Sequence, residues 1–155
     1  MITESPELGI MQLLRDDADV GLLVRSRIYA LAAPARAVMP YIVVTPISLE
    51  AQHHLQGAGT LFRGDIQVDA YGRKYAEIRA IARAMRRALH GRPNPTYVTV
   101  PDPSGANPAE PFTFQLIRLE SDQSDLFQPT DASDVPTYRA SHSYRVAYNV
   151  APSDH

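Results

Sequence analysis

Two histidines and two aspartates are the side chains in this sequence that come closest to a metal-ligand set. His53 and His54 are adjacent, and Asp65 and Asp69 follow on the segment predicted to return beside them in a hairpin. Imidazole and carboxylate groups are typical zinc ligands. Adjacent side chains on a strand point to opposite faces, which is poor geometry for one ion. We therefore interpret His53 and His54 as solvated or interface residues, and the sequence predicts no metal site.

The residue types needed for nucleophilic or phosphate chemistry are present without the spacing of a known site. The chain has no cysteine, and its serines do not form a Gly-x-Ser-x-Gly segment. Gly57, Gly59 and Gly64 are not followed by the Lys-Ser/Thr pair of a phosphate-binding loop. The sequence therefore predicts a protein that is not an enzyme and that carries no cofactor.

Two further patterns have simpler interpretations. Carboxylate pairs such as Asp16 with Asp17, and Asp122 with Asp125, lie in polar, turn-like sequence. We expect them to be solvated or to cap helices. The triplet Arg63-Gly64-Asp65 matches a cell-adhesion motif, but such triplets work at exposed loop tips, and this one lies in the middle of a predicted strand.

A row of basic side chains on one predicted helix is the strongest remaining signal. The helix is expected from about Arg73 to Leu89, and Gly91 is a good stop signal. At about 100° per residue, the apolar side chains form a buried stripe, and the basic side chains fall on one flank of the helix beside it. The residues of the stripe are Tyr75, Ile78, Ile81, Ala82, Met85 and Leu89. The basic side chains are Arg79, Arg83, Arg86, Arg87 and His90.

Three interpretations of this basic flank stay open. It is a solvated helix face, or it contacts nucleic-acid phosphates, or it pairs with acidic side chains. Two observations oppose the interpretation as a nucleic-acid contact: the helix has no interleaved aromatic residues, and the net charge of the chain is -2. For the third, Glu120, Asp122 and Asp125 lie in one acidic region. A surface that is basic on one side and acidic on another suits head-to-tail contacts between identical copies, which can close into a ring.

A long hairpin is predicted between Tyr41 and Tyr71. Its first strand is rich in β-branched residues, and Pro46 requires an edge position or a bulge there. At about 3.3 Å per residue, a twelve-residue strand would reach roughly 40 Å, beyond the core of so small a domain. We expect the distal part of the hairpin to project as an arm that contacts other subunits. Its candidate contact residues are His53, His54, Leu55, Leu61 and Phe62.

The other segments predict a single α+β domain over residues 1–155, with a mainly antiparallel sheet and two helices packed on it. Pro6 to Asp17 forms the first helix, with Ser5 as its cap. Gly91 to Pro111 is a proline-rich insertion with a short strand, "TYVTV", inside it. Phe112 to Glu120 is a strand, residues 121–136 are a polar connection, and residues 151–155 are a C-terminal tail. Alternation in "YRASHSYRVAYNV" predicts a last strand with one covered face.

Composition is consistent with a single soluble domain. The chain has 155 residues, of which 45% are hydrophobic, so it is long enough to bury a core. The absence of cysteine suits a reducing compartment. No signal peptide is expected at the N-terminus, and no apolar run is long enough to span a membrane. We expect synthesis in the cytoplasm.

The order of these segments resembles the tail-completion, or tail-terminator, proteins of long-tailed bacteriophages and gene transfer agents. The strongest similarity is in "IQVDAYGRKYAEIRAIARAMRRAL", where a strand ends in a D-x-Y tripeptide and Tyr-Ala-Glu opens a helix. The other matching segments are "ITESPELGIMQLLRDDADVGLLVRSRIYAL", "MPYIVVTPIS", "LESDQSDLFQPTD" and "YRASHSYRVAYN". Together they cover nearly the whole chain, and their order and spacing carry the resemblance. The insertion from Pro93 to Pro111 departs from shorter relatives.

The resemblance implies a non-catalytic ring, usually of six copies, at the head-proximal end of the tail tube in the virion. The ring stops tube growth and joins the tail to the head, and DNA later passes through its channel without sequence-specific binding. The implied partners are further copies of the chain, the tail-tube protein and a head-completion or stopper protein, with no membrane. The family has no fixed site whose residues carry over. A head-side connector or stopper ring is the alternative of the same class, and a nucleic-acid-binding module that uses the basic flank is the alternative of another.

Overall fold

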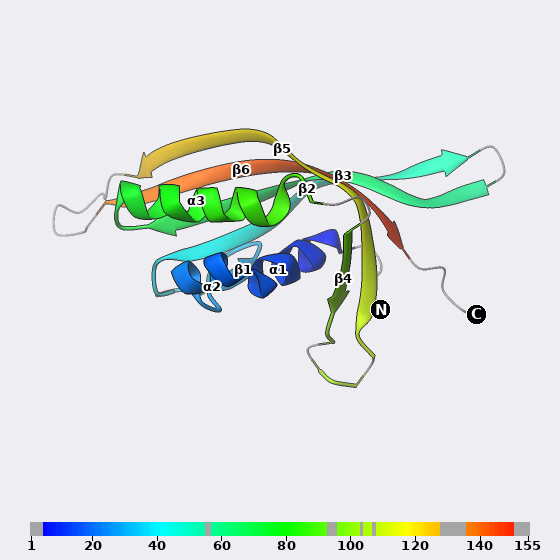
Figure 1. Cartoon of the computed structure of the whole chain (residues 1–155), viewed down its shortest axis with the longest axis horizontal. Coiled ribbons are helices and arrows are strands. Elements are labelled where there is room, and N and C mark those ends of the chain that lie inside the picture. Colours follow the sequence, from blue (N-terminus) through cyan, green and yellow to red (C-terminus); the bar gives the residue numbers. More distant parts are fainter. Residues whose placement is uncertain are drawn as a thin grey trace.

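In the computed structural model, the described residues are 5–54, 57–92, 96–102, 104–106, 108–127 and 136–150; for residues 51–54, 57–61, 110, 112, 127 and 150 only the backbone is described. They form a six-stranded sheet with the strand order β1-β2-β3-β6-β5-β4. Three helices lie against one face of this curled sheet (Figure 1). No helix among the described residues is long and apolar enough to cross a membrane.

The sheet is mixed. All its strand pairs are antiparallel except β1 with β2, which is parallel. The helices are α1 (Pro6–Asp16), α2 (Ala18–Val24) and α3 (Tyr75–Leu89). The strands are β1 (Ile28–Ala30), β2 (Tyr41–His54), β3 (Gly57–Gly72), β4 (Thr96–Val100), β5 (Glu110–Phe127) and β6 (Thr137–Val150).

The prediction of an α+β domain is confirmed, but the prediction of two helices is wrong. Asp17 does not end the helical region, because its carboxylate accepts a hydrogen bond of 3.0 Å from the Val20 N–H and so caps a second helix, α2. Gly21, a residue type that often follows the end of a helix, lies inside α2. Pro6 occupies the first turn of α1 as predicted, whereas the Ser5 side chain makes no capping hydrogen bond.

Strand β5 is longer than the predicted strand from Phe112 to Glu120. It continues to Phe127, and its additional residues pair with the first half of β6, down to Phe127 opposite Thr137. A register shift lies between Leu119 and Ser121. The polar composition of this stretch favoured a connection, but pairing with the well-patterned β6 holds it in the sheet.

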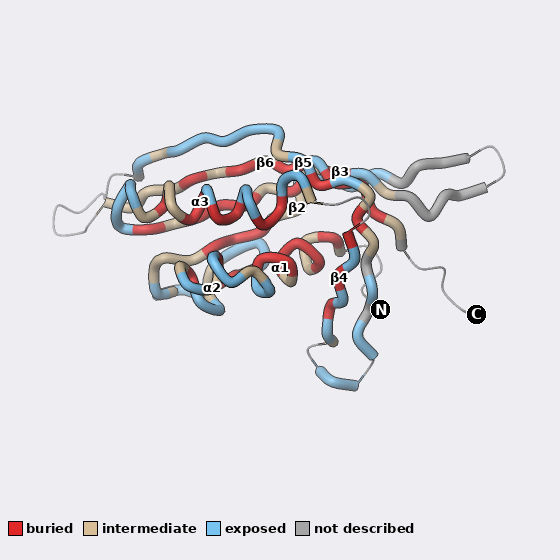
Figure 2. Tube along the Cα trace, viewed as in Figure 1, coloured by how far each residue is buried: buried red, intermediate tan, exposed pale blue. Residues whose placement is uncertain are grey.

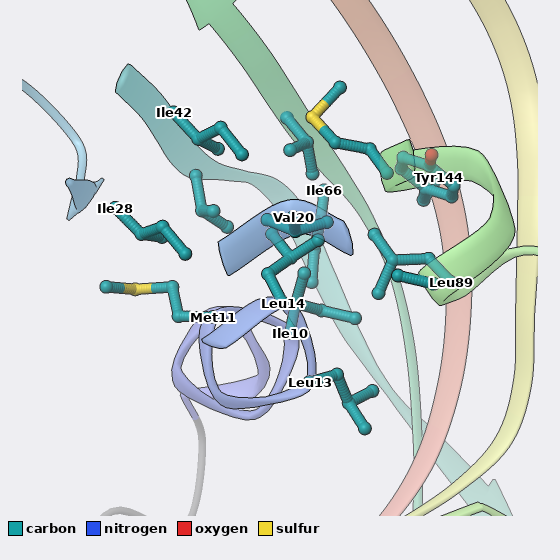
Figure 3. Close-up of a cluster of buried hydrophobic side chains, with 14 of the residues drawn as sticks. Ile10, Met11, Leu13, Leu14, Val20, Ile28, Ile42, Ile66, Leu89 and Tyr144 are labelled. Atoms are coloured by element: carbon teal, nitrogen blue, oxygen red, sulfur yellow. The ribbon is translucent and has the colours of Figure 1, made fainter. Parts of the chain in front are cut away.

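The core lies between the helices and the covered face of the sheet. As predicted, α3 buries Ile78, Ile81 and Met85. Figure 3 shows Ile10 and Leu14 of α1, Ile66 of β3 and Leu89 of α3 in one cluster of buried side chains. Tyr75 was predicted in the buried stripe of α3, but it is 55% exposed and contacts Tyr138 edge-to-face. The burial of α3 therefore begins at Ile78, one turn after Tyr75. Other fully buried members of the core are Val44, Val68, Ala70, Tyr144, Val146 and Tyr148.

The hairpin of β2 and β3 extends beyond the rest of the sheet. β3 pairs with β6 from Gly72 only as far as Leu61, which lies opposite Asn149, whereas β2 and β3 stay paired to His54 and Gly57. The outer part is therefore a two-stranded ribbon, at the right of Figure 1. This pairing agrees with the predicted arm.

A bulge at Pro46 marks the inner part of the same hairpin. The register of β2 against β3 shifts between Pro46 and Ser48, as the proline predicted. Gly64 lies opposite this region, and a Cβ atom there would come 2.2 Å from the Ser48 carbonyl oxygen. A side chain at position 64 would therefore force the two strands apart, so the glycine of the Arg-Gly-Asp triplet has a structural role.

The proline-rich insertion supplies the edge strand of the sheet. The predicted strand "TYVTV" is β4, which pairs with β5 between Glu110 and Phe114. Val98 and Val100 are buried, and Tyr97 is exposed. Gly9 of α1 lies so close to β5 that a Cβ atom there would be 2.8 Å from the Phe114 ring. The β4–β5 hairpin thus covers the N-terminal helix.

Candidate functional site

His53, His54, Asp65 and Asp69, for which the sequence predicted no metal site, lie on β2 and β3, and the Arg-Gly-Asp triplet lies on β3. Within the described residues, no group of three or more histidine, aspartate or glutamate side chains is placed to hold a metal ion. The side chains of His53, His54 and Leu61 and the whole of Leu55 lie outside the described residues. The Arg-Gly-Asp triplet lies within β3 as predicted, and its Asp65 carboxylate is 3.3 Å from the Arg145 guanidinium.

A buried histidine organises the polar contacts between α3 and the sheet. His142 of β6 is 1% exposed, and its Nδ1 atom lies 2.8 Å from the Tyr144 hydroxyl. Its Nε2 atom lies 3.2 Å from the Asp122 carboxylate on β5, without the geometry of a hydrogen bond. Asp122 in turn accepts two hydrogen bonds of 2.9 Å from Arg79 of α3. These contacts tie the helix to two strands.

The protonation states of this cluster follow from burial and charge. Burial lowers the pKa of His142, and the neighbouring Asp122 carboxylate opposes this effect only in part. The hydrogen bonds from Arg79 lower the pKa of Asp122, and burial raises the pKa of Tyr144. At neutral pH the cluster therefore holds a neutral imidazole, an ionised carboxylate and a neutral phenol. The Tyr144 hydroxyl can donate to Nδ1, which places the ring proton on Nε2, towards Asp122.

We expect the stability of the protein to fall as the pH drops below about 6.5, the ordinary pKa of histidine. The folded state lowers the pKa of His142, so unfolding takes up a proton in this range, and stability is complete only above it. The slope should be at most about 1.4 kcal/mol per pH unit from this group. Asp122, whose pKa is also lowered, acts in the same direction at more acidic pH.

The measurement is the urea midpoint at several pH values for the native sequence and for His142→Gln, which cannot titrate. Loss of the slope between neutral pH and pH about 5.5 in the variant is the expected result. An unchanged slope would assign the pH dependence to other groups.

The basic flank of α3 is divided between paired and unpaired cations. Arg79 is held by Asp122 and by the Ser124 hydroxyl, 3.1 Å away. In contrast, Arg83, Arg86 and Arg87 are exposed, and no ion pair is formed by them within the described residues. Together with His90 they line a shallow depression on the surface.

The predicted acidic counterpart of this flank is engaged within the chain. Asp122 binds Arg79, as described above, and Asp125 binds Arg139 of β6. Glu120 is 2.7 Å from Arg118. The three acidic side chains that were expected to meet a neighbouring subunit thus each have a cation of their own chain beside them. Their part in a subunit contact stays a prediction.

Phe62 is the described side chain of the predicted arm. Its ring stacks on Tyr148 at a centroid distance of 5.4 Å, and Tyr148 also contacts Phe114 at 6.2 Å. These three rings form the aromatic cluster at the base of the ribbon. Phe62 was proposed as an interface residue, and the structure places it partly inside the chain's own core.

Sequence patterns located this site only in part. The helical periodicity placed the basic residues on one flank of α3, but it did not single out His142. The sequence contained one signal for His142, because this polar residue lies on the apolar face of β6, the strand with the most regular pattern. A polar side chain that is buried requires a hydrogen-bonding partner. Its partner Asp122 is close in space and distant in sequence.

The described residues thus form a single α+β domain with an extended two-stranded ribbon and a cation-rich helix flank. The sequence model of the family described as Tail completion protein gp17 matches residues 9–148. The chain belongs to this family, and its role is a structural one in a phage-type tail, as part of a virion in which it contacts other virion proteins.

A solved structure shares the fold. A chain in the structure entitled "Virion of native gene transfer agent (GTA) particle" superposes with a TM-score of 0.64 at 18% sequence identity, covering 92% of this chain and 93% of that chain. Among curated protein sequences, none matches this chain.

Proposed function

We propose that the chain forms a ring, of six copies, that caps the head-proximal end of the tail tube. The ring ends tube polymerisation and provides the surface to which the head is joined, while DNA passes through its channel. Membership of the tail completion family supports this role. The partners are further copies of the chain, the tail-tube protein and a head-completion or stopper protein.

The observation that carries the proposal is the two-stranded ribbon beyond the end of β6. A two-stranded hairpin is at best marginally stable in water, and its edges expose unpaired main-chain groups. Between Leu61 and the tip of the hairpin, neither β1 nor β6 pairs with the ribbon within the described residues. A ribbon of this kind gains stability by lying on another subunit. The contact is head-to-tail, because the ribbon and its receiving surface differ, and such contacts close into a ring when the rotation between neighbouring copies permits it.

The proposal is tested by molar mass and by position on the tail. Light scattering over a concentration series, with and without purified tail tubes, should show a species of about 103 kDa, six times the 17.1 kDa of the chain. Gold-labelled protein added to tubes should then appear at one end only, and it should stop their growth. Label distributed along the tubes, or tubes that grow unchanged, would contradict the capping function.

A further inference from the structure

The long strand β5 has an open edge along most of its length. β4 pairs with β5 only between Glu110 and Phe114, so from residue 115 to Phe127 the described neighbour of β5 in the sheet is β6 alone. The side chains along this stretch are largely exposed, as Figure 2 shows. One main-chain group on the open side has a partner, because the Leu119 N–H donates to His90 Nδ1 at 3.0 Å. An open strand edge of this length is a template for one further strand.

Cations of α3 that form no ion pair with any other described residue lie beside this edge. Arg79 holds α3 to β5 through Asp122, and His90 holds the end of the same helix to β5 through Leu119. Arg83 and Arg86 fall between these anchors and within about 40° of Arg79 around the helix. They therefore flank β5, which runs next to α3 in Figure 1. Arg87 and His90 line the same surface depression as Arg83 and Arg86.

We propose that the open edge of β5 and the neighbouring Arg83 and Arg86 together bind an extended acidic segment of another protein. The segment adds to β5 as a strand, through main-chain hydrogen bonds. Side chains of a strand alternate between its faces, so carboxylates at every second position face α3 and pair with the arginines. This inference goes beyond the ring and does not require it.

The chemistry of the surface favours an acidic polypeptide over the other candidates. A strand edge offers alternating N–H and C=O groups, which match a polypeptide main chain and not a phosphate backbone. A second copy of this chain is a poorer occupant, because the acidic side chains along its β5 are engaged with Arg79, Arg118 and Arg139. Of the other described carboxylates, Asp16, Asp17 and Asp19 lie at helix ends. Asp65 and Asp69 lie on β3, which is paired on both sides by β2 and β6. Glu50 is the single carboxylate of β2, so that strand does not offer the alternating carboxylates of the proposed segment.

The proposal is tested with a synthetic peptide of about ten residues that alternates glutamate and threonine, a usual strand length or slightly longer. Binding to the full chain is measured by fluorescence anisotropy. We expect saturable binding that weakens about tenfold or more in the variant Arg83→Gln with Arg86→Gln. Methylation of alternate main-chain nitrogens of the peptide, which leaves its charge unchanged, should weaken binding to a similar extent.

The matched control removes two positive charges at positions outside β5 and α3. Arg36→Gln with Arg63→Gln gives the same change in net charge, and both arginines are exposed, one in the connection between β1 and β2 and the other on β3. This variant should bind the peptide as the native sequence does. Equal losses in both double variants, or undiminished binding of the methylated peptide, would reduce the effect to general charge attraction and overturn the proposal.

Two further results would also overturn it. Single-stranded DNA that binds through Arg83 and Arg86 while the peptide does not would identify a nucleic-acid surface. Loss of self-association in the Arg83→Gln, Arg86→Gln variant, measured by light scattering, would identify a second copy of the chain as the occupant. Because the peptide assay does not depend on rings, failure of the ring proposal and failure of this inference are distinguishable.

Discussion

A variant in which residues 52–61 are replaced by Asn-Gly is expected to remain a folded monomer of about the same compactness and to form no ring. Ala51 and Phe62 are paired across the hairpin, so Asn-Gly between them closes a two-residue turn of the favoured type. The replacement removes the ribbon and, of the β3–β6 pairs, only Leu61 with Asn149. Phe62 stays on Tyr148, and the core is unchanged.

Light scattering measures the expected loss of the species of about 103 kDa, and urea unfolding measures whether the shortened chain is as stable as the native one. The matched control replaces only Gln56 by glycine, and so it keeps the length of the ribbon and all of its candidate contact residues. Assembly in the control but not in the shortened variant would assign the contact to the ribbon itself. Rings of full mass in the shortened variant would remove the ribbon from the proposed contact.

Replacement of Phe114 by alanine is expected to destabilise the folded state by about 3–5 kcal/mol, a large share of the 5–15 kcal/mol typical of a domain. Phe114 is 1% exposed and lies against both Tyr148 and Gly9. It thereby joins the N-terminal helix to the β4–β5 hairpin. Truncation to alanine would leave a cavity between the helix and the sheet.

Two controls separate packing from hydrophobicity at this position. Phe114→Leu keeps much of the buried volume, and it should cost distinctly less than the alanine variant. Tyr97→Ala on the same hairpin removes a ring that is 74% exposed, and it should change the stability by no more than about 0.5 kcal/mol. Urea unfolding of the three variants gives the comparison. Similar costs for Phe114→Ala and Tyr97→Ala would contradict the assignment of Phe114 to the core.

Local patterns predicted the elements that carry their own periodicity. The stripe of Ile78, Ile81 and Met85 recurs at helical spacing, and α3 was located to within two residues at its start. The alternation along β6 likewise predicted its covered face, on which Tyr144 and Tyr148 are buried. In both cases each side chain's environment depends on its place in one helix or strand.

The same reasoning failed where a residue has two local roles. Asp17 is consistent with the end of one helix and with the start of another, and only its hydrogen bond to Val20 shows that it starts α2. The stretch from Ser121 to Phe127 is polar enough for a loop, and it becomes strand because β6 lies beside it. Propensity is a weak guide where tertiary pairing decides.

The sequence by itself determined the α+β class, the long hairpin, the amphipathic α3 with its basic flank, and the resemblance to tail completion proteins, because each depends on residues that are near one another along the chain. Only the tertiary structure decided which cations of that flank have an ion-pair partner in the described part of the chain. Arg79 and Asp122 are 43 positions apart, and the network they form with His142 depends on the lateral order of β3, β6 and β5 in the sheet. Strand order and register join distant segments, and periodicity contains no information on either.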